Sequence, residues 1–164
     1  GKMEQRFINI FKEFNNMEIK KIEGIEKVLG ILWEYDQDLQ RINFPKDSPN
    51  YEVFKERILG EYKEEPEGFF LVYEYDKVIG HLVLKTRYNP YRRQKYGEVK
   101  FIHLDANNRG KGYGTKLLEF ADEYFKNKGC KYVMAGVSIF NPASNAAFKK
   151  VGYSESRLIL EKEY

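Results

Sequence analysis

The segment Arg109–Gly114 carries the residues of this chain whose types and spacing best suit a chemical task. Glycines alternate with larger residues at 110, 112 and 114, and an amphipathic stretch follows directly from Thr115. Glycine permits the positive φ angles that turn successive backbone N–H groups inward, and it lets a ligand approach the main chain. The first turn of the following helix adds unpaired N–H groups and the positive end of the helix dipole. The segment therefore predicts a binding site for a phosphate or pyrophosphate group.

Two common nucleotide loops do not fit this segment. Counted from Gly112, the third glycine of the dinucleotide fingerprint is replaced by Leu117. The ATP/GTP loop ends in Gly-Lys followed by Ser or Thr, whereas Gly114 is followed by Thr115 and then Lys116. A glycine-rich turn between a strand and a helix, without any ligand, is the alternative interpretation that the segment leaves open.

Two motifs in order identify a family resemblance. Arg109, Gly112 and Gly114, placed after an apolar strand, resemble the acetyl-CoA loop of the GCN5-related N-acetyltransferase (GNAT) superfamily. The segment Asn141–Tyr153 is similar to that superfamily's later motif, in which an Asn opens a short helix that ends in Gly and an aromatic residue. The resemblance covers residues 17–160, with its specific motifs between 98 and 153. It implies an α/β fold of mixed α+β type, with a strongly twisted mixed sheet of about six to seven strands and helices on both faces.

Composition sets the class of protein. A length of 164 residues with 42% hydrophobic content predicts a single domain over 1–164 with a substantial core. A net charge of +3 does not indicate nucleic acid, and no apolar run would span a membrane, so neither is expected as a partner and the location is expected to be cytoplasmic. Cys130 is the single cysteine, which excludes an internal disulfide and a cysteine-built metal site, and no metal is expected.

Hydrophobic spacing predicts the elements that position the loop. Apolar residues recur at helical spacing between Phe7 and Phe14 and predict an N-terminal helical extension over 1–16. Further helices are expected from 25 to a break at 43–50, and over 51–62, 112–128 and 143–150. Strands are expected at 17–22, 69–75, 78–84, 99–104, 132–137 and 153–160, with a basic, aromatic turn at 88–94.

The resemblance implies transfer of an acetyl group from acetyl-CoA to a primary amine, by direct attack in a ternary complex. It assigns the pyrophosphate to the loop N–H groups, and the pantetheine arm to the exposed backbone of strand residues 102–104. Asn141 occupies the position of the Asn that contacts the cofactor in the superfamily. A role as the N-cap of a helix that begins at Pro142 explains an Asn at this position equally well. The expected acetyl-CoA contacts are Ile102, His103, Leu104, Arg109, Gly110, Lys111, Gly112, Tyr113, Gly114, Thr115, Asn141, Ser144 and Phe148.

An ammonium group must lose a proton before it can attack, so a general base, or a water leading to one, is expected. Glu98 is the first candidate, because residues 98–104 resemble the segment that carries the catalytic Glu of the histone acetyltransferase branch. An ordinary surface salt bridge is its alternative role. His103 is the second candidate, since the unperturbed pKa of histidine lies near neutrality. Plain alternation puts these two residues on opposite strand faces, and a bulge, which the family commonly has, would break that parity.

The chain departs from the superfamily at Phe148, where many members place a Tyr that protonates the leaving CoA thiolate. Water, Ser144, Tyr113 or Tyr153 could supply that proton instead. The departure keeps a second function open, that of a non-catalytic acyl-CoA-binding regulatory module.

The amine acceptor is expected beside residues 33–60 and 85–97. Carboxylates in the first segment suit a cationic amine such as a polyamine, an aminoglycoside-like drug, a protein lysine or an N-terminal amine. Basic residues in the second suit an acidic acceptor or assist CoA, and either charge run could be a solvated face. The chain is expected to be a monomer or a homodimer. The charged residues concerned are Glu34, Asp36 and Asp38 in the first segment, and Lys85, Arg87, Arg92, Arg93 and Lys95 in the second.

Overall fold

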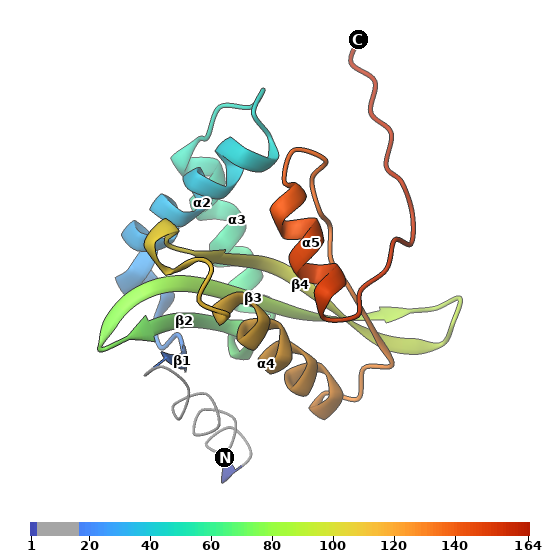
Figure 1. Cartoon of the computed structure of the whole chain (residues 1–164), viewed down its shortest axis with the longest axis horizontal. Helices are drawn as coiled ribbons and strands as arrows, with labels where there is room; N and C mark the ends of the chain where they lie inside the picture. The colour runs from blue at the N-terminus through green and yellow to red at the C-terminus, as the bar shows by residue number, and fades with distance from the viewer. Residues whose placement is uncertain (3–16) are drawn as a thin grey trace.

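The protein is built around a five-stranded mixed sheet (Figure 1). The computed structural model describes residues 1–2 and 17–164, so the helix expected over 1–16 lies almost wholly outside the described residues. The strand order is β1-β2-β3-β4-β5; the first four strands are antiparallel to their neighbours, and β5 runs parallel to β4. The strands are β1 (Met17–Lys21), β2 (Phe69–Glu74), β3 (Lys77–Asn89), β4 (Gln94–Leu104) and β5 (Tyr132–Met134).

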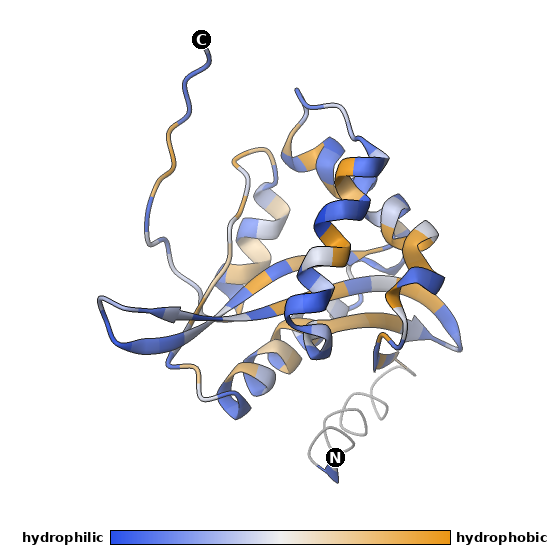
Figure 2. Ribbon diagram, turned by 180° about the vertical axis from the view of Figure 1, so that it is seen from behind, coloured by the Kyte–Doolittle hydropathy of each residue, from blue (hydrophilic) through white to orange (hydrophobic). Residues whose placement is uncertain are grey.

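Helices cover both faces of this sheet, as the sequence predicts. One apolar core lies between the sheet and helices α2 (Leu29–Asn43) and α3 (Tyr51–Glu64), and includes Leu32, Phe54 and Phe69. A second core, on the opposite face, packs Leu117 of α4 (Tyr113–Asn127) and Phe148 of α5 (Pro142–Lys150) against the strands. The apolar stripes of these helices are visible in Figure 2. Three short 3-10 helices, η1 (Ile25–Val28), η2 (Pro66–Gly68) and η3 (Ala106–Asn108), complete the described elements.

The sheet is smaller than predicted. The strand expected at 132–137 pairs only over Tyr132–Met134, and the strand expected at 153–160 forms no ladder within the described part of the chain. Residues 153–160 read Tyr-Ser-Glu-Ser-Arg-Leu-Ile-Leu, one Tyr, four polar residues and then three aliphatic ones, which is not the alternation of a half-buried strand. The expectation of six to seven strands was therefore wrong, and five are described.

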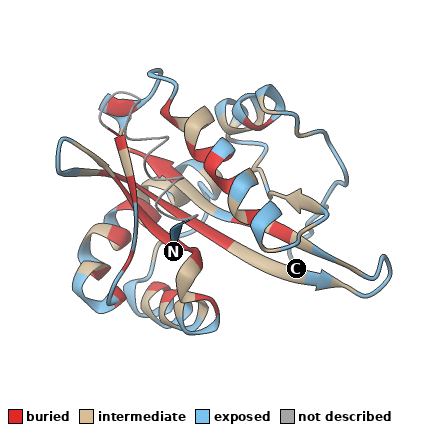
Figure 3. Cartoon of the chain, turned by 90° about the horizontal axis from the view of Figure 1, so that it is seen from below, coloured by how far each residue is buried: buried red, intermediate tan, exposed pale blue. Residues whose placement is uncertain are grey.

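The strands β3 and β4 are longer than predicted and form an extended hairpin. Their pairing continues out to Asn89 opposite Gln94, so the turn expected at 88–94 shrinks to residues 90–93. The far end of this hairpin is exposed (Figure 3). None of the described helices has the length and apolarity needed to cross a membrane.

Candidate functional site

The glycine loop joins η3 to the first turn of α4. Gly110 and Gly112 adopt positive φ angles of 75° and 82°, the left-handed conformation in which glycine is favoured. A Cβ atom at Gly110, Gly112 or Gly114 would meet nothing within 4 Å. Because Gly114 has neither a positive φ nor a crowding neighbour, the packing of the described chain does not explain glycine at that position.

The loop presents a row of unused backbone donors. Within the described chain, the N–H groups of Gly110, Lys111, Gly112, Gly114 and Thr115 donate to no other group. The N–H of Lys116 is the first in this helix to donate a hydrogen bond to a preceding turn, at 3.2 Å from the Gly112 carbonyl oxygen. Several free N–H groups at the start of a helix form an electropositive cradle suited to an anion.

Glu74, at the end of β2, anchors this loop, and no sequence pattern pointed to it. Its carboxylate accepts a hydrogen bond from the Tyr113 hydroxyl and another from the Asn108 amide, at 3.2 Å. The Lys111 ammonium lies 3.7 Å from the same carboxylate. Burial, followed by the bond to Glu74, raises the pKa of Tyr113 to about 12. This hydroxyl is therefore engaged with Glu74, which argues against Tyr113 as the proton donor to a thiolate.

Arg109 shapes the other end of the loop. Its Nε donates to the backbone carbonyl of Leu104 at 3.1 Å, which fixes the turn that leaves β4. The Leu104 carbonyl, which was expected to be available to the pantetheine arm, is therefore already bonded within the protein.

The strands β4 and β5 separate just before this loop. β5 pairs with β4 only over Tyr96–Glu98, whereas β3 pairs with β4 as far as Leu104. In the described chain, the β5-facing edge of residues 99–104 consequently has no neighbouring strand. An unpaired edge of this kind offers backbone groups to an amide-containing ligand, as one strand offers them to another. The predicted residues Ile102, His103 and Leu104 all belong to this stretch.

A bulge at Lys100 puts the two base candidates, Glu98 and His103, on the same face of β4, contrary to plain alternation. Val83 pairs with Phe101 and the next β3 residue pairs with Val99, so Lys100 is the extra residue in β4. Val99 packs in the core below α4, whereas Phe101 packs in the core below α2 and α3. The bulge breaks the alternation and places His103 on the same side as Phe101, where its ring lies 5.1 Å from that of Tyr35 in α2.

Glu98 lies on this same side and is held by two cations. Its carboxylate is bonded to the Arg87 guanidinium, and its second oxygen lies 3.9 Å from the Lys100 ammonium. Hydrogen bonding to Glu98 raises the pKa of Arg87. The Glu98 side chain retains 26% of its exposure, so it is accessible from solvent.

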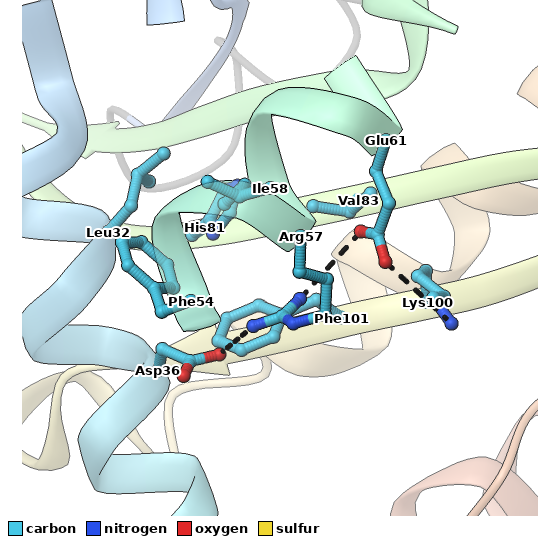
Figure 4. Close-up of a pocket in the computed structure, with 10 residues that line it drawn as sticks. All are labelled: Leu32, Asp36, Phe54, Arg57, Ile58, Glu61, His81, Val83, Lys100 and Phe101. Atoms are coloured by element: carbon cyan, nitrogen blue, oxygen red, sulfur yellow. Dashed lines mark hydrogen bonds and ion pairs between the residues drawn. The ribbon is translucent and has the colours of Figure 1, made fainter. Parts of the chain in front are cut away.

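Residues of alternating charge continue from Lys100 into the space between α2, α3 and the sheet, where Figure 4 shows Lys100, Glu61, Arg57 and Asp36. Lys100 lies 3.9 Å from Glu61 in α3, and Glu61 lies 3.7 Å from Arg57. Arg57 in turn donates to Asp36 of α2 at 2.6 Å. Asp36 is buried; burial raises its pKa while Arg57 opposes the shift. Asp36 is therefore a structural ion-pair partner, and of the three predicted acidic residues it is the one least available to an acceptor.

His103 is buried and poorly suited to take up a proton. Burial and then the Arg109 charge lower its pKa to about 4, while Asp38 acts in the opposite direction. The distance from His103 Nε2 to the nearer Asp38 oxygen is 3.6 Å, which is too long for a hydrogen bond. Nε2 has no hydrogen-bond partner among the described groups. His103 therefore remains a neutral ring near pH 7.

Three carboxylates act electrostatically on one region beside Tyr35 of α2. Burial raises the pKa of Tyr35 most, followed by the charges of Asp105, Glu34 and Asp38. The pKa of Asp105 is likewise raised, by burial and by the charges of Asp38 and Glu34, although Lys77 and Arg109 oppose the shift. Glu34, Asp38 and Asp105 thus form an acidic cluster where α2 passes the end of β4.

Most basic residues of segment 85–97 form ion pairs or other contacts within the protein. Lys85 pairs with Glu64, Arg87 pairs with Glu98, and Lys95 donates to a main-chain carbonyl at Lys128. Arg92 lies over the Tyr132 ring at 4.6 Å. Aromatic residues of the same two segments differ in burial: Trp33 and Tyr35 pack beside the core, whereas Phe44, Tyr88 and Tyr91 are exposed.

The second motif forms α5. The Asn141 side chain accepts the Ser144 N–H at 3.1 Å, which is the capping role foreseen as one of its two explanations, and it donates to Asn43 at 3.0 Å. Phe148 is 5% exposed and packs edge-on against Tyr153, with the ring centroids 4.9 Å apart. Burial raises the pKa of Tyr153, whose hydroxyl has no partner among the described groups. Phe148 is therefore a core residue, and Tyr153 packs against that core.

Comparison with known proteins agrees with this geometry. The Acetyltransferase (GNAT) family model matches residues 27–153. An uncharacterized N-acetyltransferase of Methanocaldococcus jannaschii is 26% identical over 98 residues, which cover 59% of this chain but only 43% of the relative's length.

Solved structures show the same architecture. A putative acetyl transferase from Pyrococcus furiosus superposes with a TM-score of 0.70 at 25% identity, covering 90% of this chain and 99% of the other. An aminoglycoside acetyltransferase from an uncultured soil metagenomic sample, in complex with sisomicin, has a TM-score of 0.63 at 14% identity, covering 94% and 97% of the two chains. The latter likeness shows a shared fold. Since the family model spans both motifs and most of the described chain, this protein belongs to the GNAT acetyltransferase family.

Proposed function

We propose that this protein is an acetyl-CoA-dependent N-acetyltransferase that acetylates a small cationic primary amine. The observation that carries the proposal is the separation of β4 from β5, which leaves residues 99–104 unpaired on one edge and leads directly to the free N–H groups of the glycine loop. An extended ligand with amides in its arm and a pyrophosphate at its end matches both features.

Acetyl-CoA fits the residues present. The loop N–H groups would hold its pyrophosphate, and the missing Cβ at Gly114 would let the phosphates approach the helix start. When bound, acetyl-CoA supplies an activated thioester whose acetyl group is open to attack by an amine. Ser144 and Asn141, at the start of α5, remain the proposed contacts from the second motif.

Glu98 is the proposed general base. It lies on the α2/α3 side of β4, and its side chain is 26% exposed, whereas His103 is 4% exposed. Glu98 would accept the proton directly or through a water. Arg87 and Lys100 contact the Glu98 carboxylate and fix its position on the strand. His103 is buried, has a pKa of about 4 and packs against Tyr35, so it is the poorer candidate for accepting that proton.

The acidic cluster of Glu34, Asp38 and Asp105 supports a cationic acceptor. Asp38 lies 3.6 Å from His103, and the mutual repulsion of the three carboxylates would be relieved by a positively charged ligand. The basic residues that would favour an acidic acceptor are mostly paired. A small amine is also the ligand type of the aminoglycoside acetyltransferase that shares this fold.

The test is thiol release from acetyl-CoA across a panel of amines: polyamines, aminoglycosides, lysine peptides and peptide N-termini, with an acidic amine as the comparison. Turnover with a cationic small amine is expected, and preference for the acidic amine would contradict the acceptor class. Binding of acetyl-CoA in calorimetry without turnover on any amine would instead favour the regulatory module that the buried Phe148 keeps open. No binding of CoA would contradict both functions.

A further inference from the structure

The far end of the β3–β4 hairpin carries a concentration of positive charge. Residues 85–97 contain five basic residues and no acidic one, although the whole chain nearly balances 28 basic residues with 25 acidic ones. This end of the hairpin extends beyond the helices that cover the sheet (Figure 1). The net charge of +3, on which the expectation of no nucleic-acid partner rested, therefore conceals a local separation of charge.

Most of this charge is uncompensated. Lys85 and Arg87 are neutralised by carboxylates of α3 and β4. Further out, Arg92 and Lys95 contact neutral groups, a tyrosine ring and a main-chain carbonyl, which leave their charges in place. In the part of the chain that the structure describes, no ion pair is formed by the exposed cations at this end, which are Arg92, Arg93 and Lys95 of the hairpin and Lys131 just before β5.

Exposed tyrosines lie among these cations. Tyr88 is 62% exposed, and Tyr91, in the turn, is 97% exposed. Tyr88 is directly opposite Lys95 in the β3–β4 ladder, so the two side chains share one face of the hairpin. A tyrosine ring beside a cation suits a nucleic-acid strand, because the ring stacks on a base while the cation contacts a phosphate.

Asn89 fixes the turn to the sheet. Its side-chain oxygen accepts the N–H groups of Tyr91 and Arg92, at 3.0 and 3.2 Å, and its amide donates to the Tyr132 hydroxyl of β5 at 2.7 Å. The Tyr132 ring stacks on Tyr96, with the ring centroids 5.0 Å apart, and Arg92 lies over it. The turn is therefore held in one conformation before a partner binds, which lowers the entropic cost of binding.

We propose that this end of the hairpin binds single-stranded nucleic acid. Tyr88 and Tyr91 stack on bases, and the uncompensated cations contact the phosphates. A membrane surface fits less well, because residues 88–95 include no aliphatic residue, Phe or Trp that could enter the lipid. The surface lies at the opposite end of β4 from the glycine loop, and the proposal does not depend on the proposed enzymatic function.

The first experiment is fluorescence anisotropy of the full chain with a labelled oligouridine of about 12 nucleotides, within the site size of single-strand binders. Four phosphate contacts predict that log affinity falls against log salt concentration with a slope of about −3. Arg93→Ala should weaken binding and reduce that slope by about 0.7. Arg41→Ala is the matched control, because it removes the same charge from an exposed arginine of α2 that pairs with Asp38. No binding, or an equal effect of the two variants, would overturn the proposal.

Tyrosine variants test the stacking. Tyr91→Ala should weaken binding by about 5- to 150-fold, the loss found when one stacked aromatic residue is removed. Tyr91→Phe keeps the ring and should bind like the parent. Tyr75→Ala is the control, because Tyr75 is 74% exposed in the turn between β2 and β3 and should have no effect. Parent-like binding by Tyr91→Ala would contradict the stacking and, with it, the proposed ligand.

Competition distinguishes nucleic acid from other anionic partners. Unlabelled oligouridine should displace the labelled strand, whereas poly-glutamate and vesicles containing phosphatidylserine should displace it poorly at equal charge concentration. A duplex RNA of the same length should also bind more weakly, because its bases are already stacked on one another. Equal displacement by poly-glutamate, or a preference for the vesicles or the duplex, would show that the hairpin does not recognise single strands.

Discussion

Glu98 and His103 lie on the same side of β4 because Lys100 occupies a bulge between them. Each is connected to a different helix: Glu98 reaches α3 through Lys100 and Glu61, and His103 contacts Tyr35 of α2. The strand therefore presents both base candidates to one region, with different accessibility. This arrangement makes their roles separable by experiment.

Replacing Glu98 by Gln should lower kcat by about 100-fold or more near neutral pH, because a positioned base typically contributes that much. The KM for acetyl-CoA should change little, since the glycine loop holds the other end of the proposed ligand. Steady-state thiol release with a reactive amine measures both. Glu64→Gln is the matched control, because it removes an exposed carboxylate that also pairs with a β3 cation. An unchanged pH–rate profile in Glu98→Gln would remove Glu98 as the base.

Gly114→Ala should separate stability from ligand binding. Alanine favours a helix over glycine by up to about 1 kcal/mol, and no neighbour would obstruct the added methyl group. The variant is therefore expected to unfold at a slightly higher temperature yet to bind acetyl-CoA more weakly, because the methyl group occupies the space proposed for the phosphates. Thermal unfolding and calorimetry measure the two effects.

Gly60→Ala is the control for that experiment. Gly60 is a helical glycine of α3, and its Cβ position is equally open. This change should raise stability without altering acetyl-CoA affinity. Equal affinity in the two variants would contradict the placement of the ligand at the loop.

His81 should make the fold sensitive to acid. It is 1% exposed, neither ring nitrogen has a partner among the described groups, and burial lowers its pKa to about 3. The unfolded chain takes up this proton below about pH 6.5 while the folded chain does not, so stability is lost as the pH falls from there toward the folded pKa. Between pH 7 and 5 the loss is about 2 kcal/mol for this histidine.

The measurement is urea unfolding of the parent and of His81→Leu at both pH values. Leucine is similar in size and has no proton to gain, so the stability of the variant relative to the parent should rise by about 2 kcal/mol on acidification. His103 and the carboxylates titrate in both proteins and cancel from the comparison. Parallel pH profiles would show that His81 takes up a proton in the folded state.

Phe148→Tyr should not restore a proton donor. The ring is packed against Tyr153 in the core, so the new hydroxyl would be buried, and a buried hydroxyl without a partner costs about 1–3 kcal/mol. A lower unfolding temperature with no rise in kcat is expected. A faster enzyme would instead show that the side chain can reach the thiolate and that its protonation limits the rate.

Local sequence determined much of this protein. The positive φ angles at Gly110 and Gly112, the Asn141 cap and the helix that follows each motif depend on neighbouring residues, so they were predictable from spacing. Hydrophobic periodicity predicted the helices, and the family resemblance predicted their placement on both faces of the sheet.

Tertiary structure decided how the site is assembled. The Lys100 bulge depends on register with β3, Glu74 meets Tyr113 across 39 positions of sequence, and Arg57 meets Asp36 across 21. Whether residues 153–160 form a strand depends on pairing with another strand, which the local sequence does not encode. Such contacts are fixed only when the packing of helices and strands brings distant residues together, and packing is a property of the whole chain.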